Sequence, residues 1–250
     1  APGEALLVTW QVFAYTGPRE ALRVRVRPAG ELGVWAASAD LPVVGMSTHS
    51  YRFPMEGVWF IGAGASLHSH HRWMIAEEFG LDILRIGGDG ATHRGDGSAF
   101  SDYLAYSAEV RAAAAGEVVA AVDGIAEDLG AMQRAGESDE DYNRRLLADQ
   151  ARRLSGGDEA IIGNHVVIRH QGDEYSVYAH LQPGSVRVRV GQELAAGEVL
   201  GLLGSSGNST EPHLHFQLCD GPRPLHCAGI PIAFEGFDAP PQTGDIVGGE

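Results

Sequence analysis

Histidines are the residues of this sequence best suited to chemistry, and two of the 11 form a His-x-His pair, His213-Leu214-His215, on a predicted strand. Residues two apart on a strand project from the same face, so we expect His213 and His215 to enter one pocket while Leu214 faces the core. A loop of small residues, 204–210, precedes the pair and would let a substrate approach the backbone. This context favours a site over two surface histidines.

An acid inside an apolar stretch is the second indication of a site. Asp82 lies in a predicted buried strand, where an unpaired carboxylate is unfavourable, so it needs a cation, either a metal ion or Arg85. Upstream, His68, His70 and His71 offer a further imidazole. Two neutral imidazoles and one carboxylate, with water in the fourth position, are typical of a catalytic zinc site.

Two further features have both a functional and a purely structural interpretation. His180 ends a predicted strand, and the residues alone do not separate a catalytic histidine from a structural one. Cys219 and Cys227 are the two cysteines, so a closed thiolate metal site is excluded. The pair fits two buried thiols or a local disulfide in an oxidising compartment. We expect the disulfide, because the pair flanks a turn-rich loop.

Composition excludes several classes of function. The chain has 250 residues, with 33 acidic and 18 basic side chains and a net charge of −15, which argues against binding to nucleic acid or to anionic lipid. Every basic residue is arginine, so a biotinyl or lipoyl carrier, which needs a lysine, is excluded. No apolar run approaches the roughly 20 residues that span a bilayer.

Hydrophobic patterning predicts short strands with one helical insertion. We expect one or two surface helices between residues 125 and 158, with Ser138 as an N-cap and a solvated acidic face. The predicted strands are 6–13, 22–27, 118–122, 166–170, 175–180 and an alternating, glycine-turned segment at 186–201.

Taken together, His180, the small-residue loop and the His-x-His pair make the chain resemble the lysostaphin/LytM-type zinc peptidases. The resemblance covers about 60–235 and is most specific over 163–218. It implies a mainly β fold, a glycine-rich antiparallel β sandwich/barrel hybrid with a short helical insertion and an N-terminal β segment. Together with the patterning of the rest of the chain, the expected organisation is a β segment of unknown role at 1–60, a zinc peptidase domain at 61–235 and a polar, Pro/Gly-rich flexible tail at 236–250.

The resemblance also implies roles for individual residues. His215 and Asp82 correspond to zinc ligands, and His180 and His213 assist the attacking water and the oxyanion. The first ligand departs from the family pattern, which has a histidine four residues before the aspartate, where this chain has Glu78. The candidates are His71, His70 and His68, and we favour His71, so the expected metal ligands are His71, Asp82 and His215.

The expected function is a zinc-dependent endopeptidase that hydrolyses amide bonds in peptidoglycan cross-links with a zinc-activated water and one Zn²⁺ per chain. The alternative is a degenerate domain of this type that regulates another cell-wall hydrolase. Peptidoglycan peptides are the expected substrate, and other cell-wall hydrolases are candidate partners. The expected location is secreted, periplasmic or in the cell envelope. No signal peptide is recognisable after Ala1, which fits one that has been removed.

Overall fold

The computed structural model describes residues 20–26, 37–42, 46–134 and 136–248, and the chain divides into two units, Ala1–Gly45 and Met46–Glu250. In the smaller unit, β1 (Ala21–Val26) pairs antiparallel with β2 (Ala37–Pro42). This confirms the strand predicted from the alternation of apolar and charged residues at 22–27. The strand predicted at 6–13 lies outside the described residues.

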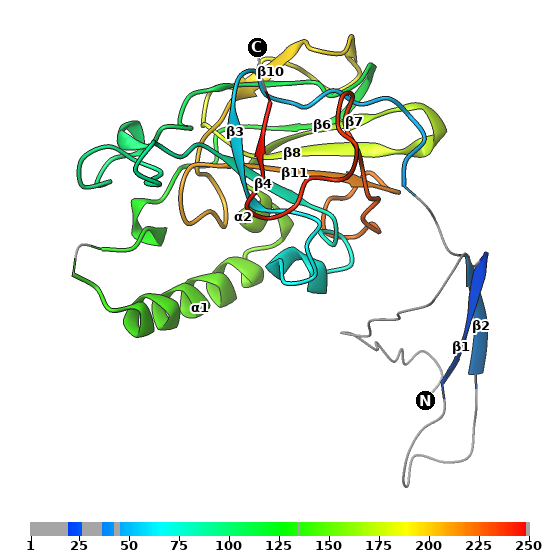
Figure 1. Cartoon of the computed structure of the whole chain (residues 1–250), viewed down its shortest axis with the longest axis horizontal. Helices are drawn as coiled ribbons and strands as arrows, with labels where there is room; N and C mark the ends of the chain where they lie inside the picture. The colour runs from blue at the N-terminus through cyan, green and yellow to red at the C-terminus, as the bar shows by residue number, and fades with distance from the viewer. Residues whose placement is uncertain (1–19, 27–36, 43–45, 135, 249–250) are drawn as a thin grey trace, which may run out of the picture. The chain divides into compact units, whose positions relative to one another are not determined.

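The larger unit is built on one antiparallel sheet of eight strands (Figure 1). From one edge to the other the strands are β12 (Ile246–Val247), β3 (Trp59–Ala63), β4 (Leu81–Leu84), β11 (Leu214–Cys219), β8 (Tyr175–Leu181), β7 (Asn164–Arg169), β6 (Gly116–Val122) and β9 (Glu193–Leu194). A separate pair joins β10 (Val199–Leu202) to β5 (Glu109–Arg111). The predicted mainly β fold is therefore confirmed.

Helices are few, and the longest, α1 (Asp139–Ser155), lies in the insertion predicted at 125–158, whereas α2 (Asp158–Ile162) starts where that insertion was expected to end. The described 3-10 turns are η2 (His70–Trp73), η3 (Phe100–Asp102), η4 (Leu129–Ala131) and η5 (Gln171–Asp173). Ser138 caps α1 as expected, because its Oγ accepts from Asp141 N at 3.2 Å. No helix among the described residues combines the length and apolar character that a bilayer crossing requires.

Alternation along the central strands separates a core face from a site face. Leu81, Ile83, Leu214 and Phe216 are almost fully buried in the main hydrophobic core. The residues between them, Asp82 on β4 and His215 on β11, therefore point to the opposite face of the sheet. The sheet thus supports polar groups on one side by burying a continuous apolar layer on the other.

Three segments differ from the sequence-based expectation. Residues 186–190 form no strand, so that prediction is wrong. Arg187 N donates to Leu200 O, but one backbone hydrogen bond does not make a strand. Alternation of apolar and polar residues does not by itself provide a neighbouring strand to pair with. Residues 46–60 belong to the larger unit, where Tyr51 and Trp59 are core residues. Near the C-terminus, where the sequence suggests a flexible tail, β12 pairs with β3.

Candidate functional site

Asp82 lies at the centre of the candidate site. It is directly opposite His215 in the register of β4 and β11, and its Oδ1 is 3.1 Å from His215 Nδ1. Both residues are less than a tenth exposed. Arg85, the alternative partner considered from sequence, places its guanidinium 4.1 Å from the centre of the Trp59 ring. The described neighbours of this carboxylate are imidazoles.

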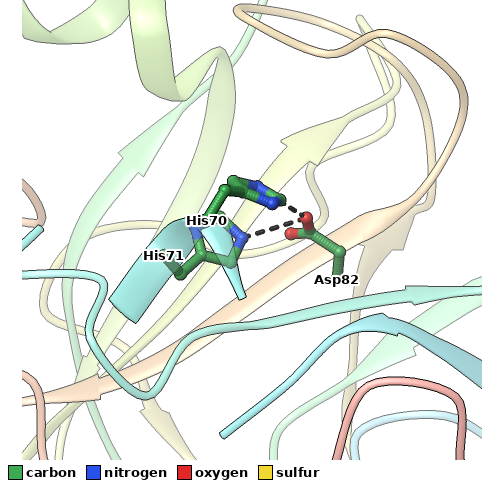
Figure 2. A group of neighbouring side chains, drawn as sticks. All are labelled: His70, His71 and Asp82. Atoms are coloured by element: carbon green, nitrogen blue, oxygen red, sulfur yellow. Dashed lines mark ion pairs between the residues drawn. The ribbon is translucent and has the colours of Figure 1, made fainter. Parts of the chain in front are cut away.

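Two histidines of η2 approach the other carboxylate oxygen (Figure 2). His71 Nε2 is 2.9 Å and His70 Nε2 is 3.5 Å from Asp82 Oδ2. The His71 side chain is 7% exposed, whereas that of His70 is 72% exposed. His68 is exposed and forms no ion pair with Asp82 among the described residues. The structure therefore brings His71, Asp82 and His215 together and places His70 beside them.

Glu77 fixes a hydrogen on Nδ1 of His71, which leaves Nε2 as the nitrogen that faces Asp82. Glu77 Oε2 lies 3.1 Å from His71 Nδ1, and a carboxylate only accepts, so Nδ1 carries the hydrogen. Burial lowers the pKa of His71, but Asp82 and Glu77 outweigh it and raise this pKa to about 10. His71 Nε2 is buried and has no hydrogen-bond partner among the described residues. Such an atom beside a carboxylate needs a proton or a metal ion between the two.

His180 and His213 form the other side of the site. Their ring centres are 4.8 Å apart, and His213 Nε2 is 3.5 Å from Asp82 Oδ1. Backbone carbonyls fix both rings: His180 Nδ1 donates to Ser206 O and His213 Nδ1 donates to Glu211 O, each at 2.8 Å. Nε2 of each ring is therefore the atom that remains available for chemistry.

A bulge in β8 turns His180 toward the site. Simple alternation would place His180 on the same face as Tyr178, which packs in the main core. The register between β7 and β8 shifts between Asn164 and Val166, and His180 has φ = 63°. Bulges redirect side chains, and a non-glycine residue at positive φ stores strain of about 1–3 kcal/mol. The bond from the ring to Ser206 O, together with the backbone bond from Gly204 N to His180 O, holds this conformation.

The 204–210 loop positions His180 as well as bordering the site. Ser206 Oγ donates to Leu181 O at 2.7 Å and accepts from Asn164 N at 2.9 Å. At Gly207, where φ is 75°, an added Cβ would lie 2.5 Å from Gly163 N. The small residues of this loop are therefore needed for its packing. The sequence had suggested a different role for them, which is to let a substrate approach the backbone.

Electrostatics separates the two histidines that the sequence could not distinguish. Burial, together with His213 and His215, holds the pKa of His180 well below its usual value. Burial also lowers the pKa of His213, but Asp82 outweighs it and raises that pKa. Burial raises the pKa of Asp82, but His71 and His213 bring it well below its usual value. In this arrangement of charges, His213 therefore holds a proton at a higher pH than His180 does.

These side chains line one wall of a cavity of about 330 Å³. Gln150 and Leu154 of α1 line it too, as do Met74 after η2 and Leu225 of the loop between the cysteines. Arg153 attaches α1 to the site loop, because its guanidinium donates to Gly207 O at 2.6 Å. The insertion therefore contributes to the cavity that a substrate would enter.

The donor set fits a metal ion. His70, His71 and Asp82 each offer one ligand atom within 4.8 Å of the others, and His215 Nδ1 lies on the remaining carboxylate oxygen. Neutral imidazole nitrogens and a carboxylate are the ligands that Zn²⁺ takes in catalytic sites. The buried Nε2 of His71 lies 2.9 Å from Asp82 Oδ2 with no hydrogen bond between them, so it is the atom best placed to share a cation with the carboxylate.

Sequence reasoning missed two residues that contact the candidate ligands. Glu77 bonds to His71, and no spacing pattern in the sequence indicated it. Gln217 Oε1 lies 2.8 Å from His215 Nε2. Gln217 is two residues after His215, so the rule that put His213 and His215 on the same face of the strand could also have predicted Gln217 there. Cys219 and Cys227 form a disulfide, as expected.

Part of the chain matches a known protein family. Residues 153–226 match the model of Peptidase family M23, a segment that contains His180, His213 and His215 but neither His71 nor Asp82. The peptidoglycan DD-endopeptidase ShyA of Vibrio cholerae is 40% identical over 73 residues, which are 28% of this chain and 16% of that protein. The DD-carboxypeptidase/endopeptidase Mpg of Neisseria meningitidis is 36% identical over 70 residues, with the same two coverages.

These curated relatives are longer proteins, and the match covers about a sixth of their length. Among solved structures, a mutant catalytic domain of the prophage-encoded M23 protein EnpA from Enterococcus faecalis aligns with a TM-score of 0.37 and 17% identity, covering 69% of this chain and 87% of that one. The catalytic domain of lysostaphin from Staphylococcus simulans aligns with a TM-score of 0.34 and 17% identity, covering 74% and 88%.

Proposed function

Residues 153–226 are a Peptidase family M23 segment, and from this premise we propose that the larger unit is a zinc-dependent endopeptidase that cleaves amide bonds in peptidoglycan cross-links. The observation that carries the proposal is the convergence on one buried carboxylate, Asp82, of imidazoles from two separate segments, η2 and the His-x-His pair at the start of β11. Peptidoglycan is the proposed substrate because it appears in the name of the relative ShyA.

His71, Asp82 and His215 are the proposed ligands of one Zn²⁺. His71 is preferred to His70 because its Nε2 is closer to Asp82 and is buried, whereas the His70 side chain is largely exposed. When bound, zinc polarises the scissile carbonyl and makes the attacking water more acidic.

His180 and His213 divide the proton transfers in this proposal. Ser206 O takes the Nδ1 hydrogen of His180, and its low pKa keeps the ring neutral, so Nε2 accepts the proton of the attacking water. Glu211 O takes the Nδ1 hydrogen of His213, so a proton that its Nε2 gains is donated to the carbonyl oxygen, where negative charge develops, or to the leaving amine. Each transfer is general acid–base catalysis by a positioned imidazole.

The ligand choice predicts different effects of two neighbouring substitutions. His71→Ala is expected to lose most of the zinc, because it removes a buried ligand and leaves two. His70→Ala is expected to retain close to one zinc per chain. Metal analysis after dialysis against buffer without chelator measures both. Equal retention by the two variants, or loss in His70→Ala alone, would reverse the assignment.

The substrate is tested by digestion of purified peptidoglycan, with the products identified by mass spectrometry. We expect new amino and carboxyl termini at a peptide cross-link, produced by the wild type and suppressed by a zinc chelator. Products cut in the glycan strand, or between sugar and peptide, would reject the endopeptidase assignment. We also propose a secreted, periplasmic or cell-envelope location, for which the disulfide is the supporting observation.

A further inference from the structure

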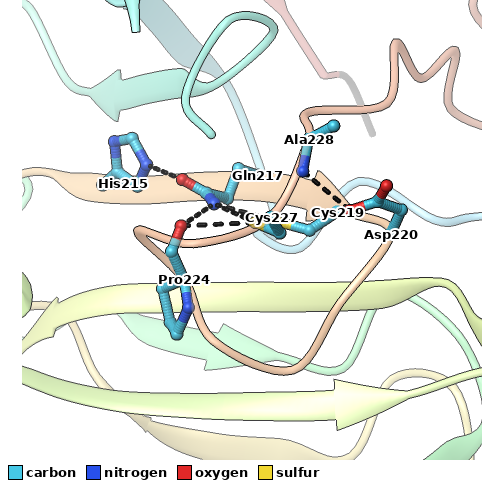
Figure 3. The surroundings of a disulfide bond; sticks show 7 residues. All are labelled: His215, Gln217, Cys219, Asp220, Pro224, Cys227 and Ala228. Carbon is cyan, nitrogen blue, oxygen red and sulfur yellow. Dashed lines mark hydrogen bonds between the residues drawn. A yellow bond between two sulfur atoms is a disulfide. The ribbon is translucent and has the colours of Figure 1, made fainter. Parts of the chain in front are cut away.

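Gln217, two residues after His215 on β11, has its side chain on the same face of the sheet as the candidate site. This side chain is 2% exposed, and its Oε1 lies 2.8 Å from His215 Nε2, the nitrogen that faces away from Asp82 (Figure 3). A buried glutamine has two polar ends and must satisfy both. The other end determines which way the amide points.

The amide nitrogen of Gln217 faces acceptors. It donates to Pro224 O at 2.9 Å and lies 2.8 Å from Cys219 Sγ. A flipped amide would place Oε1 against the Pro224 carbonyl oxygen, which cannot donate. The Pro224 carbonyl therefore selects the orientation in which Oε1 faces His215.

This orientation dictates the proton position on His215. Gln217 Oε1 only accepts, so His215 Nε2 must carry a hydrogen. In the neutral imidazole, Nδ1 then has the lone pair, and Nδ1 is the atom 3.1 Å from Asp82 Oδ1. The glutamine thus directs a basic nitrogen, rather than an N–H, to the position where a metal would lie.

Pro224 is held by the loop that the disulfide closes. Cys219 ends β11 and is bonded to Cys227. Just beyond the loop, Ala228 N donates to Asp220 Oδ1 within it at 2.7 Å. Cys227 packs in a small buried cluster with Ala76, which lies just before Glu77. The loop therefore fixes the Pro224 carbonyl relative to β11.

We propose that Gln217 is a positioning residue for metal binding: held by Pro224 of the disulfide-closed loop, it keeps His215 in the Nε2–H tautomer and its Nδ1 free to bind the metal. This inference rests on the proposed function, because His215 is a ligand only if the site binds zinc. Outer-shell partners of ligating histidines fix the ring and its tautomer in this way.

The test measures zinc affinity and the tautomer of His215 in the whole chain. Competition with a chromophoric chelator at pH 8 gives the zinc Kd, and imidazole ¹⁵N NMR of the zinc-free protein gives the protonated nitrogen. Gln217→Leu is expected to raise the Kd by about 10–100-fold and to remove the preference for Nε2–H. Gln217→Glu, which retains an acceptor toward Nε2–H, is expected to bind zinc more tightly than Gln217→Leu.

Ser176→Ala is the matched control. Ser176 is buried on β8 opposite Leu218 in register, on the other face of the sheet, and it bonds to His170, which is outside the site. The control is expected to lower thermal stability and leave the zinc Kd unchanged. If the wild type binds zinc, either of two results would overturn the proposal. One is an unchanged zinc Kd in folded Gln217→Leu, and the other is an Nδ1–H tautomer of His215 in the wild type. Failure of the wild type to bind zinc would instead reject the proposed function.

Discussion

Asp82→Asn is expected to lose zinc binding and peptidoglycan hydrolysis together. The carboxylate lies within 3.5 Å of four imidazole nitrogens, those of His70, His71, His213 and His215. Asparagine keeps the shape of the side chain but removes the charge that balances a cation. As a proposed direct ligand, Asp82 should matter more than an outer-shell partner, so we expect zinc affinity to fall by more than about 100-fold.

Metal analysis and chelator competition on the folded variant measure this effect, and release of peptidoglycan fragments measures activity. Asp158→Asn is a suitable control, since Asp158 forms an Asp–His pair with His226 at 2.9 Å outside the site. We expect this control to retain both properties. Full zinc occupancy in Asp82→Asn would contradict the ligand set.

His213→Ala and His180→Asn are expected to keep the zinc and the fold but lose most turnover. Neither residue is a proposed ligand, and each acts on a proton or on the developing oxyanion. General acid–base assistance contributes about 10²–10⁴-fold, so kcat should fall by about that factor in each variant. Asparagine is chosen at position 180 because it tolerates positive φ better than alanine, and His180 has φ = 63°.

Turbidity loss of purified peptidoglycan, with and without added amidases, separates an enzyme from a regulator. Clearing by the wild type alone, abolished in His213→Ala, supports the peptidase. A regulator of another hydrolase would clear the suspension only when an amidase is present, and would be unaffected by His213→Ala. That second pattern would make the alternative function correct.

Local patterns in the sequence were enough for the elements that carry the site. The sequence predicted strands around Asp82 and His215, and β4 and β11 confirm them. The period of two predicted that His215 faces away from Leu214 and Phe216, which lie in the core. The N-cap and charge pattern around Ser138 predicted a helix, and α1 begins there. These features depend on contacts within a few residues, which is why they can be read from a single sequence.

Tertiary structure decided the remaining features of the site. The sequence left His68, His70 and His71 open, and only the packing of η2 against β4 shows which of them approaches Asp82. Glu77 and Pro224 act through contacts that no repeat or motif encodes. His180 violates the alternation rule, because a bulge and a positive φ turn it to the site face. Such a conformation is unfavourable locally and persists because the ring is bonded to Ser206 O, 26 residues away in the sequence, so the sequence around His180 alone could not predict it.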